Sequence, residues 1–346
     1  MSARTYSVAV VGATGAVGRE MLKMLDDRDF PVGELRVMAS ARSAGNTLTW
    51  RDRTLTIEDL QTADFTGVDF ALFSAGGSTS KEHAPRVASQ GAIVIDNSSA
   101  WRMDDDVPLV VPEVNADALG EIPKGIIANP NCSTIQMVVA LKPIADAVGI
   151  ERVVVSTYQS SSGAGQTGIE ELMSDVNAFM FEGMPETERK KFAHPLAFDV
   201  LPHIDVFFDS GYTREELKMV HETRKIMSAP KMQISATAVR VPVIRSHSEA
   251  ITLDLGEALT TEQARELLSK APGVKLYDDP EKNIYPLARL AEGTDPTWVG
   301  RIRQDLDRPE TLHLWVVADN LLKGAALNAV QIAEALIAND NKETTS

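Results

Sequence analysis

The sequence predicts an α/β protein of two domains, in which a parallel-sheet domain precedes an α+β domain. Its 346 residues exceed what one ordinary hydrophobic core holds. Over residues 1–132, short β-rich runs alternate with helical patterns, which is typical of a parallel sheet covered by helices. Over residues 133–319, several β-branched strands lie close together, which favours a mixed or antiparallel sheet. We expect these two ranges to be the two domains.

Each element is predicted from its hydrophobic period. In the first domain, strands are expected at Tyr6–Val11, Leu35–Ala39, Phe70–Phe73 and Ala92–Ile95, and a helix at Val17–Leu25. In the second, a helix is expected at Ile135–Ala147 and strands at Arg152–Gln159, Ile234–Ile244, Ala250–Leu255 and Leu312–Ala318. A final amphipathic helix runs to about Ala338.

Composition and charge exclude several classes of protein. The hydrophobic share of 44% and charged share of 24% are those of a soluble globular chain, and no apolar run is long enough for a membrane helix. The segment Met1–Tyr6 leads straight into a predicted strand without a signal peptide, so we expect a cytoplasmic protein. A net charge of −15 repels nucleic acid, and a small anionic substrate needs a local cluster of Arg and Lys.

A glycine-rich loop, Gly12-Ala-Thr-Gly15-Ala-Val-Gly18, joins the first strand to the first helix. Glycines at such a turn let backbone amides approach a pyrophosphate at the helix N-terminus. The second strand then runs into Ser40-Ala-Arg-Ser43, without the carboxylate that binds the ribose 2′-hydroxyl of NAD. The pattern therefore predicts a dinucleotide site in which Arg42 favours NADP; the alternatives are a plain glycine turn and a solvated arginine.

The single cysteine, Cys132, stands in Asn129-Pro-Asn-Cys-Ser-Thr134, directly before a predicted helix. A helix N-terminus stabilises a thiolate, which favours a nucleophile over a buried structural cysteine. Among the six histidines, His247 lies amid small polar residues between two strands and is the best candidate for a base. One cysteine allows no internal disulfide, and no ligand spacing suggests a metal site.

The chain resembles the aspartate-semialdehyde dehydrogenases over nearly its whole length. The likeness rests on the glycine loop, the segment around Cys132 and three further motifs, Tyr158-Gln-Ser-Ser-Ser-Gly163, Glu215-Glu-Leu-Lys218 and Arg240-Val-Pro-Val-Ile-Arg-Ser-His247. The resemblance implies reduction of L-aspartyl-4-phosphate with NADPH, in the biosynthesis of lysine, diaminopimelate, threonine and methionine. It also implies a Rossmann-like first domain, a catalytic and dimerisation domain, and a final helix (about residues 320–340) that returns to the first domain.

The resemblance further implies residue roles. Cys132 attacks the acyl phosphate to form a thioester, His247 is the acid/base and Gln159 positions the substrate or a water. Arg240 binds the substrate α-carboxylate and Glu215 its α-ammonium. The residues implied to bind the phosphate are Arg102, Asn131 and Lys218. Those implied to contact the nucleotide are Thr14, Gly15, Ala16, Val17, Arg42, Ser43, Ser162, Gly163 and Asn320. A homodimer or homotetramer is implied as well.

Two features of the sequence bear on these roles. Thr213-Arg-Glu-Glu216 predicts a capping box, which leaves Glu215 and Lys218 on one helical face. Arg240 and His247, seven residues apart, face opposite ways on a straight strand, so a bend near Pro242 or a strand end before His247 must intervene.

Two other functions compete with this interpretation. N-acetyl-glutamyl-phosphate reductase shares the fold and the Cys/His chemistry, but Glu215 argues against it because an acetylated nitrogen carries no charge. A non-catalytic NADP sensor keeps the glycine loop but has no use for Cys132, His247 and Arg240 together.

Overall fold

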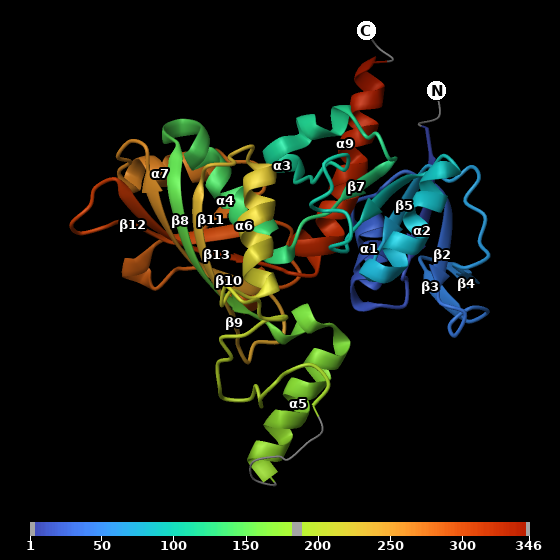
Figure 1. The fold of residues 1–346 in the computed structure, drawn as a ribbon, viewed down its shortest axis with the longest axis horizontal. Helices are drawn as coiled ribbons and strands as arrows, with labels where there is room; N and C mark the ends of the chain where they lie inside the picture. Colours follow the sequence, from blue (N-terminus) through green and yellow to red (C-terminus); the bar gives the residue numbers. More distant parts are fainter. Residues whose placement is uncertain (1–3, 182–188, 344–346) are drawn as a thin grey trace. The chain divides into compact units, whose positions relative to one another are not determined.

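The computed structural model describes residues 4–181 and 189–343, without the side chains of 341–343. The chain divides into two compact units (Figure 1). The first runs to Asn131 and resumes at Ala325, and the second is Cys132–Gly324. In the described residues, no helix is long and apolar enough to cross a membrane.

The first unit is built on one sheet with the strand order β3-β4-β2-β1-β5-β6-β7. Its strands are β1 (Tyr6–Val11), β2 (Val32–Ala39), β3 (Thr47–Trp50), β4 (Arg53–Asp59), β5 (Phe70–Phe73), β6 (Ile93–Asp96) and β7 (Ile126–Ala128). All pairings are parallel except that of β3 with β4. The hairpin β3–β4 was not predicted, because its strands alternate exposed Thr with apolar residues and lack a continuous apolar run.

The helices of this unit are α1 (Ala16–Asp27), α2 (Gly77–Ser89), α3 (Pro112–Asn115), the 3₁₀ turn Ala116–Gly120 and α9 (Leu327–Glu343). Helix α9 packs against α1 although about 300 residues separate them, which confirms the expected return of the chain's last helix. One contact is bidentate, from Arg28 to Glu334 at 2.8 Å. A π-helical turn, Leu322–Ala326, leads into α9.

The second unit holds a mixed sheet with the order β11-β12-β13-β10-β8-β9. Its strands are β8 (Ile150–Gln159), β9 (Gln233–Arg240), β10 (His247–Leu255), β11 (Val274–Leu276), β12 (Thr297–Gln304) and β13 (Thr311–Ala318). Its helices are α4 (Cys132–Val148), α5 (Gln166–Phe181), α6 (Arg214–Ile226), α7 (Thr261–Lys270) and α8 (Ala288–Ala291), with 3₁₀ turns at Ser161–Ala164 and Pro280–Lys282.

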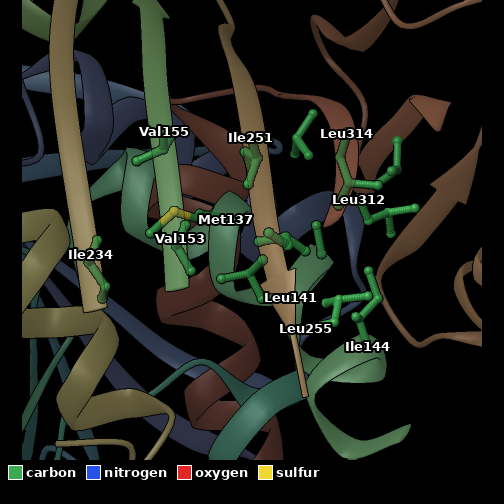
Figure 2. Close-up of a cluster of buried hydrophobic side chains, with 14 of the residues drawn as sticks. Met137, Leu141, Ile144, Val153, Val155, Ile234, Ile251, Leu255, Leu312 and Leu314 are labelled. Carbon is green, nitrogen blue, oxygen red and sulfur yellow. The ribbon is translucent and has the colours of Figure 1, made fainter. Parts of the chain in front are cut away.

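The core of the second unit lies between this sheet and helices α4, α6 and α7. Figure 2 shows Met137, Leu141 and Ile144 of α4 facing apolar side chains of the strands. Leu141 and Leu312 are fully buried. Burial of an aliphatic side chain of this size contributes about 1.5–3 kcal/mol, so this layer fixes α4 against the sheet.

Strand ends differ from the sequence prediction in one place that matters. The run Ile234–Ile244 was expected to be one strand, but β9 stops at Arg240 and β10 starts at His247. Val241 donates to the Gln159 carbonyl, and Ser246 adopts a left-handed φ of 73°. The chain therefore crosses from one neighbour of β8 to the other, which is the strand end that the spacing of Arg240 and His247 requires.

Candidate active site

Strand register brings the predicted catalytic side chains to one edge of the second sheet. Gln159 pairs with Arg240 at the ends of the parallel strands β8 and β9. Strand β10 is antiparallel to β8, so its first residue, His247, lies at the same edge. Residues that are about 90 positions apart in the chain thus meet because three strands begin or end together.

Cys132 is the first residue of α4, where unpaired backbone amides favour a thiolate. Its side chain is half-buried. The Arg240 guanidinium faces it: burial lowers the pKa of Arg240, and the charges of Glu215 and Cys132 oppose that shift. Gly324 packs against the cysteine so closely that a Cβ there would lie 2.7 Å from that of Cys132.

The geometry of His247 fixes the place of its proton. Its ring is fully buried, and Nδ1 lies 3.1 Å from both the backbone nitrogen and the hydroxyl of Ser160. A backbone N–H only donates, so Nδ1 accepts and the proton of the neutral ring is on Nε2. Burial, and then the charge of Arg240, lower the pKa of His247 to about 3. The ring is therefore a neutral Nε2–H donor.

Glu215 is the centre of a buried polar cluster. It accepts from Gln159 Nε2 at 3.0 Å and from Lys218 Nζ at 3.1 Å, and Arg240 attracts it. Lys218 also binds Asp205 at 3.2 Å. The predicted capping box is confirmed: the Glu216 carboxylate accepts from the Thr213 nitrogen at 2.7 Å, and the Thr213 hydroxyl accepts from the Glu216 nitrogen at 3.3 Å.

Ser160 is a residue that the sequence analysis did not single out. Its carbonyl accepts from Arg240 Nη1 at 2.6 Å, while its nitrogen donates to His247. Its hydroxyl reaches Asn320 Oδ1 at 3.2 Å. The same Asn320 oxygen accepts from the Ser246 nitrogen at 2.9 Å and from Ser162 Oγ at 3.1 Å. The serine run Ser160–Ser162 after a strand was the available signal.

Three predicted cofactor residues, Ser162, Gly163 and Asn320, border this cluster. A Cβ at Gly163 would lie 2.8 Å from Arg240 Nη1 and 3.2 Å from His247 Nε2, so only glycine leaves both groups clear. Asn320 and Ser162 are joined by hydrogen bonds within the second unit. The structure thus gathers Cys132, Gln159, Ser162, Gly163, Glu215, Lys218, Arg240, His247 and Asn320 in the second unit.

Two predicted phosphate-binding residues belong to the first unit. Arg102 is buried and donates to the carbonyls of Asn129 and Asn97, each at 2.9 Å. Asn131 is buried as the last residue of that part of the unit. These two hydrogen bonds to backbone carbonyls fix the position of the Arg102 guanidinium.

The glycine loop of the first unit has the stereochemistry that the motif requires. Gly12 has a φ of +84°, and a Cβ there would lie 2.5 Å from the Ser74 carbonyl oxygen. A Cβ at Gly18 would collide with the Gly12 carbonyl. Thr14, Gly15, Ala16 and Val17 lie between them, at the start of α1. Glycine at both positions thus allows the tight turn that places the N-terminus of α1 beside the loop, where such motifs bind an anion.

A cleft of about 570 Å³ adjoins this loop at the ends of the strands. Ser40 follows β2 and lines the cleft, and Arg42 and Ser43 stand in the turn beyond it, where Ser43 N bonds the Ser40 carbonyl. Several residues of its wall were not predicted, because they come from β4, the turn after it and α2: Asp59, Gln61, Thr79, Glu82 and His83. In the parts of the chain that are described, no three His, Cys, Asp or Glu side chains gather as a metal site requires.

Two family models match the chain. Residues 7–122 match the NAD binding domain of semialdehyde dehydrogenases, and residues 141–323 match their dimerisation domain. The aspartate-semialdehyde dehydrogenase of Aquifex aeolicus is 57% identical, over 96% of this chain and 98% of its own. That of Bacillus subtilis is 52% identical, over the same shares. The chain belongs to the aspartate-semialdehyde dehydrogenase family.

A solved structure agrees with the fold over nearly the full length. The aspartate semialdehyde dehydrogenase II of Vibrio cholerae, complexed with ASA, has a TM-score of 0.94 at 48% identity and covers 97% of this chain and 99% of its own. The predicted fold class is confirmed, a nucleotide-binding α/β domain followed by a dimerisation domain. The chain is an oxidoreductase of aspartate-family amino-acid biosynthesis, and the sensor and the acetylated-substrate reductase are set aside.

Proposed function

We propose that this enzyme reduces L-aspartyl-4-phosphate to L-aspartate 4-semialdehyde with NADPH, through a thioester on Cys132. One observation carries the proposal: a thiol at a helix N-terminus, an Nε2–H histidine and a buried Arg–Glu pair meet at one sheet edge. A thiol and a histidine provide acyl transfer, and the charged pair matches an α-amino acid.

The first chemical step is acyl transfer to sulfur. The Cys132 thiolate attacks the acyl carbonyl, a C–S bond forms, the C–O bond to phosphate breaks and inorganic phosphate leaves. The helix N-terminus and Arg240 stabilise the thiolate before attack. We assign the phosphate to Arg102, Asn131 and Lys218, and Gln159 to a place beside the acyl group.

The second step is reduction of the thioester. NADPH, when bound, supplies the hydride. His247 holds its proton on Nε2 and donates it toward the oxyanion of the hemithioacetal, as the acid/base of the proposal. Collapse of this intermediate returns the hydroxyl proton to His247 Nε2, breaks the C–S bond, releases the aldehyde and restores the thiolate.

Substrate selectivity rests on two buried charges of opposite sign. Arg240 offers a guanidinium to the α-carboxylate, and Glu215 a carboxylate to the α-ammonium. Each already has partners that hold it in place: the Ser160 carbonyl accepts from Arg240, and Glu215 accepts from Gln159 and Lys218. Because these partners fix the two groups before substrate arrives, little side-chain entropy is lost on binding.

We assign the nucleotide to the first domain, predicted as residues 1–132 completed by about residues 320–340, and catalysis and dimerisation to the second, predicted as residues 133–319. The nucleophile Cys132 stands at this boundary as the first residue of the second unit. The glycine loop fits a pyrophosphate, since Gly12 and Gly18 leave no room for a Cβ in the tight turn that leads into α1. Its residues Thr14, Gly15, Ala16 and Val17, with Arg42 and Ser43 for the 2′-phosphate, form one part of the site. Ser162, Gly163 and Asn320 provide the remaining contacts.

The proposal includes a homodimer or homotetramer formed by the dimerisation domain. The sheet face away from α4 carries aromatic side chains, among them Tyr158 and Trp315 with ring centroids 5.4 Å apart. A hollow of about 350 Å³ beside Trp315 is lined by Tyr285, Arg301 and Arg303, and a second copy fits such a surface. We place the enzyme in the cytoplasm, where a thiol nucleophile stays reduced.

The test is the reverse reaction, followed by the absorbance of reduced nicotinamide. With aspartate semialdehyde, phosphate and NADP, we expect reduction of NADP that requires all three components. N-acetylglutamate semialdehyde is the matched control and should support little or none, because its acylated nitrogen leaves Glu215 without a partner. Equal rates with the two aldehydes would contradict the substrate assignment, and no rate with either would contradict the reaction.

A further inference from the structure

Glu249 is a buried carboxyl group that the mechanism does not use. It lies on β10 two residues after His247, so both side chains point to the same face of the sheet. Its side chain is fully buried, and neither oxygen has a hydrogen bond of ordinary geometry. No salt bridge reaches it within the described residues.

Gln136 occupies the corresponding place on α4. It follows Cys132 by four residues, which is one helical turn, and therefore lies on the same side of the helix. It is also buried, with both amide atoms outside ordinary hydrogen-bond geometry. Helix α4 packs against β10, and the Gln136 amide lowers the pKa of Glu249 against the larger effect of burial. The nucleophile and the histidine thus each have a buried polar neighbour, and these neighbours face each other.

We propose that Glu249 is a neutral carboxylic acid that pairs with the Gln136 amide, and that this pair positions His247 relative to Cys132. The acid O–H donates to the amide oxygen, and the amide N–H donates to the carbonyl of the acid, so one pair satisfies both groups. Glu249 touches no reacting atom and is a positioning residue. The kinetic part of this inference rests on the proposed function.

Neutrality follows from what surrounds the carboxyl group. Burial, with Glu215 on α6 adding repulsion, raises the pKa of Glu249 well above its ordinary value against a smaller opposing effect of Gln136. The cluster also holds Cys132 on α4, His247 on β10, Arg240 on β9 and, bound to Glu215, Lys218 on α6; Arg240 attracts Glu215 and Cys132. An ionised Glu249 would add a second carboxylate to this cluster and oppose the thiolate.

Thermal unfolding of Glu249→Gln tests neutrality. Glutamine keeps the shape and pairs with Gln136 as an amide, but it never ionises. Because the pKa of Glu249 is raised in the folded state, the stability that the neutral acid contributes is fully present below the unfolded pKa of about 4.5 and is lost as the pH rises above it. The Tm of wild type should therefore fall relative to that of Glu249→Gln as the pH is raised above about 5. A Tm difference that does not change with pH would overturn the neutral acid.

Steady-state kinetics test the positioning role. Glu249→Gln should keep kcat within about threefold of wild type, whereas Glu249→Leu and Gln136→Leu should each lower kcat by roughly 10- to 100-fold with KM little changed. Alkylation of Cys132 by iodoacetamide should have the same pH midpoint in wild type and Glu249→Gln, whereas the loss of an ionised Glu249 would lower that midpoint. Should Glu249→Leu not fold, Gln136→Leu carries the comparison.

The outcomes separate this inference from the proposed function. An active wild type with an inactive, folded Glu249→Gln would show that an ionisable carboxyl is needed and would overturn the inference alone. Full kcat in folded Glu249→Leu or Gln136→Leu would overturn the positioning role. An inactive wild type would contradict the proposed function, while the Tm and alkylation measurements would still decide whether Glu249 is neutral.

Discussion

The two units build their sites from different materials. In the first, the loop around Gly12 works through backbone: its glycines keep side chains away, and the cleft beside it is open to solvent. In the second, buried side chains such as Glu215, Arg240 and His247 hold one another in place. A backbone site tolerates changes in the side chains around it, whereas a buried charged cluster is sensitive to each member. Substitutions in the first unit should thus change cofactor affinity, and those in the second the chemical step.

Cys132→Ala should produce the largest effect. Loss of the nucleophile should lower kcat by more than about 10³-fold, while NADPH binding, measured by titration, stays within about twofold of wild type. Cys132→Ser should be nearly as inactive, because an alkoxide is harder to form than a thiolate. Half the wild-type rate in Cys132→Ala would show that the chemical step does not depend on this side chain of the second unit.

The pH dependence of stability should distinguish the buried histidine from an exposed one. Because the folded-state pKa of His247 is lowered to about 3, the stability that the neutral ring contributes is lost as the pH falls below the unfolded pKa of about 6.5. Between about pH 7 and about pH 4.5, wild type should lose roughly 2–3 kcal/mol more unfolding free energy than His247→Gln. Urea unfolding measures it, with His221→Gln on the exposed side of α6 as control. Identical acid slopes in wild type and His247→Gln would show that the ring is not buried in its neutral form.

Arg42→Ala tests the one charged side chain assigned to the nucleotide. A charge-assisted hydrogen bond to the 2′-phosphate is worth roughly 1.5–3 kcal/mol, so the KM for NADPH should rise roughly 10- to 150-fold. NADH lacks that phosphate, and its KM should barely change. The measured quantity is the ratio of kcat/KM for NADPH over NADH. If this ratio is unchanged, Ser40 and Ser43 become the next candidates for the phosphate.

Gly163→Ala should give the smallest effect, because the nearest atom belongs to the end of a flexible side chain. The added Cβ would displace Arg240 Nη1, 2.8 Å away, and should lower kcat/KM for the semialdehyde by about tenfold. Gly120→Ala, where a Cβ meets open space, is the matched control. An unaffected enzyme would mean that the guanidinium moves aside freely.

The same contrast explains what the sequence predicts and what it does not. The glycine loop, the capping box at Thr213 and the start of α4 at Cys132 depend on neighbouring residues, so their patterns predict them. The roles of Ser160 and Glu249 depend on which strands pair and in which register, which no local pattern encodes. The part of the cleft wall that comes from β4 was not predicted for a different reason, because this strand has little apolar content.

The central claim is that reduction proceeds through an acyl group on Cys132. It is tested most directly by incubating the enzyme with L-aspartyl-4-phosphate without NADPH, denaturing it and measuring the mass of the intact chain. We predict a mass increase of one aspartyl acyl group, located on the peptide that contains Cys132, labile to hydroxylamine and absent from Cys132→Ala. An active wild-type enzyme that carries no such adduct, or carries it on another residue, would contradict the account.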